Sequence, residues 1–206
     1  MMMQEMAETS NSTRWTLPTS ALQASYQEMA TDGRRGHEGI ALWAGTETPG
    51  LPGHVVVSHV LLLRGPGISK SRFQIRVSAE LLNDVTDELT AIGGDVYLVG
   101  QVHGHPPGAR VDLSETDIRY GIQMPDYLSV VAPRFGMDTE PRLDECGVHV
   151  FESGRGYRRL ATHEARARLV IDPNHPVDIR IVGEVSTGSR DADLSHPAQT
   201  TEGEPA

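Results

Sequence analysis

The sequence predicts a single domain of mixed α+β class, with helices packed against a sheet. Two segments carry apolar residues at helical spacing, and short apolar or alternating runs typical of strands fill most of the remaining central region. Glycine and proline residues separate these segments. The 206 residues are enough for one domain with a substantial core. We place this domain at residues 14–183, between polar tails at 1–13 and 184–206 that we expect to be disordered.

The first half of the domain is expected to form a helix followed by three strands. Pro18 suits the first turn of the helix, which ends near Gly33. Its core-facing stripe consists of Leu22, Tyr26, Met29 and Ala30. Two apolar runs, 40–44 and 54–63, predict strands. A third strand is indicated by the alternating apolar residues Phe73, Ile75 and Val77.

The second half is expected to begin with a helix that Ser78 caps and Gly93-Gly94 ends. Its apolar face consists of Leu81, Leu82, Val85, Leu89 and Ile92. An apolar strand at 96–102 follows, and Ser114 precedes a short helix. Further strands are expected at 127–131, 147–151, 156–160 and 179–182. Segment 164–171 fits either a helix or a strand.

The composition argues against several classes of protein. The net charge is −10, but −2 falls on 1–13 and −4 on 184–206, so the domain itself is only mildly acidic and we expect no nucleic-acid partner. The single cysteine, Cys146, excludes an internal disulfide and suits a reducing compartment, so we expect a cytoplasmic location. The sequence has no apolar run long enough to span a bilayer, and its first residues do not resemble a secretory signal.

Two histidines, His103 and His105, follow the apolar strand at 96–102. Alternate residues of a strand point to the same face, so both imidazoles can be directed at one point. The helix after Ser114 places Asp117 at its third position, where a carboxylate can join them. Two histidines and one carboxylate leave a fourth tetrahedral position for water, which is the pattern of a catalytic zinc site.

Zinc lowers the pKa of bound water to roughly 7 and polarises a carbonyl group. A carboxylate that is not a ligand must then take the water proton and pass it to the leaving amine. The candidates are Asp112 and Glu115 close to the histidines, and Glu38 at the entrance to the strand at 40–44.

Each of these residues also has a simpler interpretation. Ser114 and Asp117 could form only a capping box at a helix N-terminus. Arg110 and Asp112, on the loop beside the metal, could contact substrate or be merely solvated. Cys146 precedes a histidine at Cys-X-X-His spacing, but the chain offers no second pair, so we expect Cys146 to be a core thiol.

At these positions the chain resembles the JAMM (JAB/MPN) metalloprotease family, particularly its bacterial members. The family motif is a glutamate on an early strand, then His-X-His-Pro, then Ser-X-X-Asp. Here these are Glu38, His103-Gly104-His105-Pro106 and Ser114-Glu115-Thr116-Asp117, and the likeness covers roughly residues 17–160. Two features depart from the family: the loop Pro106 to Leu113 is one residue longer than usual, and position 104 is glycine where serine or threonine is common.

The resemblance implies an α-β-α sandwich around a curved mixed sheet. It implies that His103, His105 and Asp117 bind Zn²⁺, that Glu38 is the general acid/base, and that Ser114 stabilises the oxyanion. The implied activity is a zinc-dependent (iso)peptidase that cleaves after the C-terminus of a ubiquitin-like protein. Alternatives are processing of a sulfur-carrier protein, a non-catalytic MPN scaffold, and a RadC-like protein linked to DNA, which the mildly acidic domain does not favour.

Overall fold

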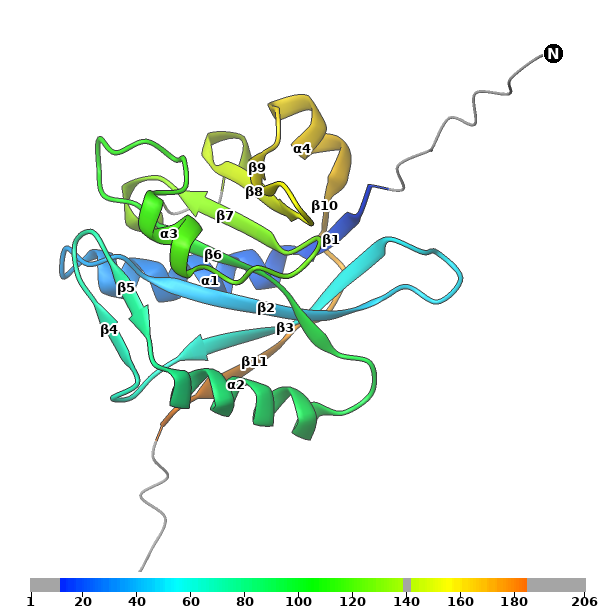
Figure 1. Cartoon of the computed structure of the whole chain (residues 1–206), viewed down its shortest axis with the longest axis horizontal. Helices are drawn as coiled ribbons and strands as arrows, with labels where there is room; N and C mark the ends of the chain where they lie inside the picture. The colour runs from blue at the N-terminus through cyan, green and yellow to red at the C-terminus, as the bar shows by residue number, and fades with distance from the viewer. Residues whose placement is uncertain (1–11, 139–141, 185–206) are drawn as a thin grey trace, which may run out of the picture.

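The computed structural model describes residues 12–138 and 142–184, which form a curled mixed β-sheet with few helices (Figure 1). The strands are β1 Arg14–Pro18, β2 Ile40–Glu47, β3 His54–Leu63, β4 Ile68–Lys70, β5 Ile75–Val77, β6 Tyr97–Gly104, β7 Leu128–Ala132, β8 Gly147–Glu152, β9 Gly156–Arg159, β10 Leu169–Asp172 and β11 Asp178–Val182. The helices are α1 Thr19–Gly33, α2 Ala79–Ile92, α3 Glu115–Tyr120 and α4 Thr162–Arg168, with short 3-10 turns η1 Arg134–Gly136 and η2 Leu143–Glu145. The predicted α+β class is confirmed.

The order of strands in the sheet is β10-β1-β3-β2-β6-β7-β8-β9, and β11 pairs with β3 beyond the end of β1. Strand β2 runs antiparallel to both β3 and β6, while β6 and β7 are parallel. The register places Ile40 opposite His103, and the amide of Gly104 donates to the carbonyl of Gly39 over 3.0 Å. Consequently Glu38 and the histidine pair lie at the same end of two neighbouring strands.

The two faces of β2 pack against different helices. Ala41 and Trp43 belong to the larger buried cluster, which includes the α1 residues Ala21, Leu22, Tyr26 and Met29. Ile40 and Leu42 point to the other face and join the α2 residues Leu81 and Val85. The alternating direction of side chains along β2 therefore places one helix on each face of the sheet.

Three expectations about the elements were incomplete or wrong. Residues 14–18 form β1, because they pair with β3 on one side and β10 on the other; Pro18 ends that strand and precedes α1. Phe73 is not part of a strand: the amide of Ser71 bonds to the carbonyl of Gln74 and closes a turn that leaves Phe73 72% exposed. Segment 164–171 is divided between α4 and β10. Most of the two expected tails, 1–13 and 184–206, lies outside the described residues.

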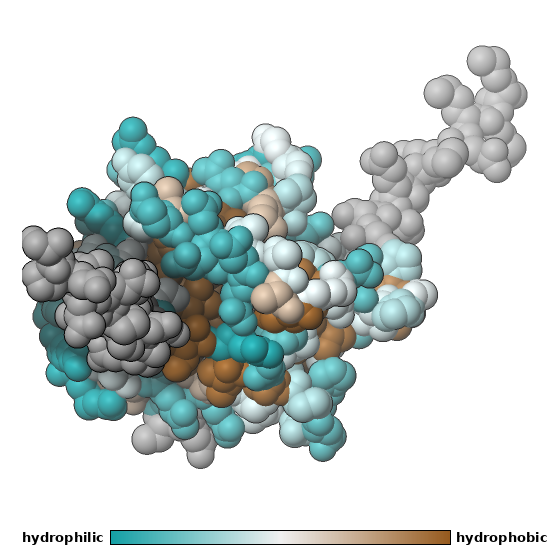
Figure 2. Space-filling model, turned by 90° about the horizontal axis from the view of Figure 1, so that it is seen from below, coloured by the Kyte–Doolittle hydropathy of each residue, from teal (hydrophilic) through white to brown (hydrophobic). Residues whose placement is uncertain are grey.

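Hydrophobic residues also reach the surface. Figure 2 views the molecule from below, the side of α2 and β11 in Figure 1, and shows several patches of hydrophobic residues between hydrophilic ones. The exposed large hydrophobic residues of α2 and β11 are Leu82, Ile179 and Ile181. Within the described part of the chain, none of the helices has the length and apolar character needed to cross a membrane.

Candidate metal centre

The backbone around the two histidines is fixed from both sides. His103 is the penultimate residue of β6 and is buried between Ile40 of β2 and Val131 of β7. His105 follows the strand; its amide donates to the carbonyl of Ala132 over 2.9 Å, and its carbonyl accepts from the amide of Phe135 over 2.6 Å. These bonds fix the backbone of both histidines at the end of β6.

Glycine at position 104 is required by the turn η1. A Cβ atom on Gly104 would lie 2.6 Å from the carbonyl carbon of Phe135, closer than packed atoms can approach. The close approach is possible because Arg134 and Phe135 both adopt left-handed backbone conformations, with φ of 53° and 59°. The glycine at this position, where the JAMM motif that the chain resembles commonly has serine or threonine, thus has a local steric reason.

The helix α3 brings the carboxylate of Asp117 to the histidines. The Ser114 hydroxyl accepts from the amide of Asp117 over 3.1 Å, and the Asp117 carboxylate accepts from the amide of Ser114 over 2.7 Å. This reciprocal pair is the capping box expected as an alternative to metal binding. The same carboxylate oxygen also faces both imidazoles, so capping and metal binding are compatible.

Three potential ligand atoms form a compact triangle. The Nε2 atoms of His103 and His105 are 3.2 Å apart, and they lie 3.6 Å and 3.5 Å from Oδ2 of Asp117. A tetrahedral zinc ion with ligands at 2.0–2.1 Å needs ligand atoms roughly 3.3–3.4 Å apart. Within residues 12–138 and 142–184 this is the group of histidine, cysteine and acidic side chains that could hold a metal ion.

The tautomer of His105 suits metal binding. Its Nδ1 atom lies 2.8 Å from the carbonyl oxygen of Arg110. A carbonyl oxygen only accepts hydrogen bonds, so Nδ1 carries the proton and the lone pair of Nε2 is free for a metal ion. The longer loop between Pro106 and Leu113 therefore contributes directly to the site, because Arg110 orients one of the candidate ligands.

The pKa values of two carboxyl groups at the site are shifted in opposite directions. Asp117 is kept charged, which favours a cation, and Glu38 can carry a proton. Burial would raise the pKa of Asp117, but the imidazoles of His103 and His105 that face its carboxylate outweigh it and hold that pKa well below its usual range. Burial raises the pKa of Glu38 to about 7, with His105 opposing and Asp117 adding to the shift. A carboxyl group with such a pKa can accept and release a proton near neutrality.

Two cavities meet the candidate metal site. The first, of about 680 Å³, is named here the Phe73 cavity and is lined by Glu38, Phe73, His105, Pro106, Ala109, Arg110, Asp112, Leu113 and Ser114. The second, of about 490 Å³, is named the α2-side cavity; its lining includes Ile40, Leu42, Ile75, Leu82, His103, Asp117 and Tyr120. Asp112 lies in the first cavity but is bound by Arg110 and Arg159, and Glu115 is exposed on α3, so Glu38 is the buried acid at the site.

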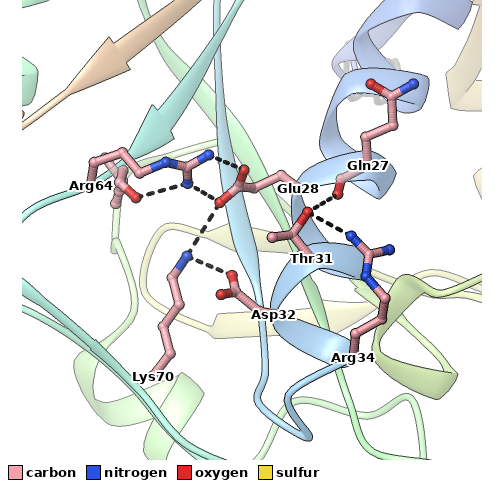
Figure 3. A network of polar contacts seen from close by, with 8 residues as sticks. Gln27, Glu28, Thr31, Asp32, Arg34, Arg64 and Lys70 are labelled. Carbon is pink, nitrogen blue, oxygen red and sulfur yellow. Dashed lines mark hydrogen bonds and ion pairs between the residues drawn. The ribbon is translucent and has the colours of Figure 1, made fainter.

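A partly buried ion-pair network joins α1 to Arg64 and Lys70 (Figure 3). Lys70, at the end of β4, lies 2.7 Å from Asp32 and 3.4 Å from Glu28, and both acids belong to α1. Arg64 pairs with the same Glu28. No local sequence pattern indicates this network, because Lys70 is 38 residues from Asp32.

Comparison with known proteins does not place the chain in a family. No family model matches it, and neither does any of the curated proteins. A solution structure of a protein from Salinibacter ruber is similar to it, with 16% sequence identity, a TM-score of 0.44, and coverage of 78% of this chain and 94% of that chain.

Proposed function

We propose that the chain is a zinc-dependent (iso)peptidase of the JAMM type, which cleaves after the C-terminus of a ubiquitin-like protein. The observation that carries this proposal is the convergence of His103, His105 and Asp117, with ligand atoms 3.2–3.6 Å apart, beside the buried acid Glu38. Two nitrogen ligands and one oxygen ligand suit zinc better than magnesium or calcium. The presence of one helix on each face of the sheet supports the α-β-α sandwich of that family.

The roles follow from the contacts of each residue. When bound, zinc would polarise the scissile carbonyl and acidify a water molecule. Glu38 would take the proton of that water and deliver it to the leaving amine, because it is the buried carboxylate at the site that is not a candidate ligand. The Ser114 hydroxyl oxygen already accepts from the amide of Asp117, so its proton remains available to an oxyanion.

The experiment that tests this proposal compares Glu38→Gln with the wild type. A panel of ubiquitin-like and sulfur-carrier proteins, each joined through its Gly-Gly end to a fluorescent peptide, would serve as substrates. We expect the wild type to bind one zinc ion per chain and to cleave at least one of them. Glu38→Gln should keep its zinc and lose at least ~100-fold in rate, since general acid–base catalysis contributes about that much or more.

The matched control is Glu115→Gln, which removes an exposed acid on α3 and should leave the rate unchanged. Removal of zinc with a chelator should abolish cleavage, and added zinc should restore it. Absence of stoichiometric zinc would favour the non-catalytic scaffold instead. Cleavage of the sulfur-carrier proteins alone would identify the alternative substrate class.

A further inference from the structure

The two cavities at the candidate metal site are not equivalent. Glu38 and Ser114 border the Phe73 cavity, whereas His103 and Asp117 border the α2-side cavity. His105 belongs to the first and lies 3.2 Å from His103 of the second. A substrate that crosses the metal site would therefore occupy both cavities, with its scissile bond between them.

The position of Glu38 sets the direction in which the substrate lies. The leaving amine must come within hydrogen-bond reach of the carboxylate that protonates it. Glu38 borders the Phe73 cavity and not the α2-side cavity. The acyl part, which ends at the carbonyl, then extends along the α2-side cavity, and the part that carries the amine departs through the Phe73 cavity.

We propose that the Phe73 cavity binds the amine-bearing side of the substrate, and that Phe73 is its specificity-determining apolar wall. This inference rests on the proposed peptidase function. Phe73 is 72% exposed although it is aromatic, and it sits on the β4–β5 turn beside Glu38. A large exposed apolar side chain at the border of a candidate active site is a typical contact residue for a partner.

The rest of the Phe73 cavity agrees with an apolar leaving group. Pro106, Ala109 and Leu113 supply further apolar surface to the lining. Two charged residues of the lining offset one another, because Asp112 accepts from Arg110 over 2.7 Å. Such a cavity suits an aliphatic group next to the amine: the methylene stem of a lysine in an isopeptide bond, or an aliphatic side chain that follows a linear peptide bond.

The backbone turn that carries Phe73 is held in place by polar contacts. The turn that carries Phe73 is closed by the bond from the amide of Ser71 to the carbonyl of Gln74, 2.9 Å long. Lys70 anchors the start of the same turn to α1 through Asp32. A contact surface that is ordered before binding loses less conformational entropy when the substrate arrives.

The experiment uses the ubiquitin-like protein that is cleaved in the assay above, joined to three leaving groups. The first is a lysine ε-amine, the second a peptide that begins with leucine, and the third a peptide that begins with aspartate. We expect the wild type to prefer one or both apolar leaving groups over aspartate. Phe73→Ala should reduce kcat/KM for the apolar leaving groups by roughly tenfold and leave the aspartate probe nearly unchanged.

Tyr120→Ala is the matched control. Tyr120 is 73% exposed, stacks under Arg119 as Phe73 does under Arg72, and lines the α2-side cavity. Its replacement should change kcat/KM for all three probes by the same factor, with zinc content unchanged in both variants. Equal losses on all three probes in Phe73→Ala would overturn this inference while leaving the peptidase function intact. If the wild type cleaves no probe, the proposed function fails and the inference fails with it.

Discussion

The amide of Glu38 donates a 2.7 Å hydrogen bond to the carbonyl oxygen of Ser71. The candidate general base is thereby tied to the turn between β4 and β5. The preceding residue, Lys70, is ion-paired with Asp32 and Glu28 of α1. The helix therefore fixes the hairpin, and the hairpin fixes the backbone of Glu38.

Replacing Lys70 with methionine should weaken both the fold and the reaction. The side chains of Lys70 and Asp32 are only 11% and 12% exposed, so the variant leaves a carboxylate of α1 buried without its nearest cation. We expect the free energy of unfolding, measured in urea, to fall by about 2–3 kcal/mol. At temperatures where the variant is folded, kcat should fall while zinc content stays at one per chain. Lys70→Arg should recover part of both losses; a variant as stable as the wild type would contradict the anchoring role.

The variant Asp117→Asn separates helix capping from metal binding. Asparagine can still accept the hydrogen bond from the amide of Ser114, because its side-chain oxygen occupies the position of the capping carboxylate oxygen. It removes the charge that completes the triangle with His103 and His105. We expect zinc to stabilise the wild type by about 2.7 kcal/mol at a concentration 100-fold above Kd.

In Asp117→Asn this zinc-dependent stabilisation should be lost, and the stability without zinc should fall only by the contribution of the charge that faces His103 and His105, because the cap is kept. Thermal unfolding with and without zinc gives both quantities. His105→Ala serves as the comparison, since it removes a ligand without touching the capping box. Undiminished stabilisation of Asp117→Asn by zinc would mean that Asp117 acts only as a cap.

The lowered pKa of Glu28 predicts how the stability of the fold depends on pH. Burial alone would raise the pKa of Glu28, but the hydrogen bond and charge of Arg64, with Lys70, outweigh it and lower that pKa. A lowered pKa in the folded state means that the stabilisation is present above the unfolded value of about 4.3 and is lost as the pH falls toward the folded value. In urea titrations between pH 6 and about pH 3, the stability of the wild type should therefore fall more steeply than that of Glu28→Gln. Parallel curves would show that Glu28 contributes no pH dependence.

The sequence was sufficient to predict the parts of the fold and of the site that depend on local spacing. The cap of α2 by Ser78, its end at Gly93 and the box formed by Ser114 and Asp117 all follow from short-range patterns. The geometry of His103 and His105 follows from the alternation of side chains along a strand and its end. These features require only neighbours within one element or one turn.

The parts that the sequence did not predict depend on pairing between distant segments. Strand β1 has no distinctive pattern of its own and is defined by its register with β3 and β10. The contact of Glu38 with Ser71 joins two loops, and the approach of Phe135 to Gly104 depends on the left-handed conformation of η1. Contacts between residues so far apart in the sequence close long loops, and they produce no periodic pattern that could be recognised.

Gly104→Ser tests whether the chain can accept a residue common at this position in the JAMM family. The new Cβ would lie 2.6 Å from the backbone of Phe135, so η1 must move away from the histidines. Forced repacking of this kind costs about 1–3 kcal/mol, and we expect zinc affinity to fall as well, because Phe135 also donates to the carbonyl of His105. Calorimetric zinc titration and urea unfolding measure the two effects. Unchanged zinc affinity would show that η1 does not position His105.

The reactivity of the Cys146 thiol can be used to test whether the core is closed to solvent. Its thiol is buried and lies 3.2 Å from the hydroxyl of Tyr26, as expected for a core thiol. Burial raises the pKa of Cys146 to about 11, so at pH 8 almost none of the reactive thiolate is present, compared with roughly a quarter for a free cysteine. We expect a disulfide reagent to leave the folded protein unlabelled at pH 8 and to label one thiol per chain in urea. Lys70→Met should be labelled faster under native conditions, because a less stable fold exposes the thiol more often. Rapid labelling of the folded wild type would show that the thiol is accessible and not part of the core.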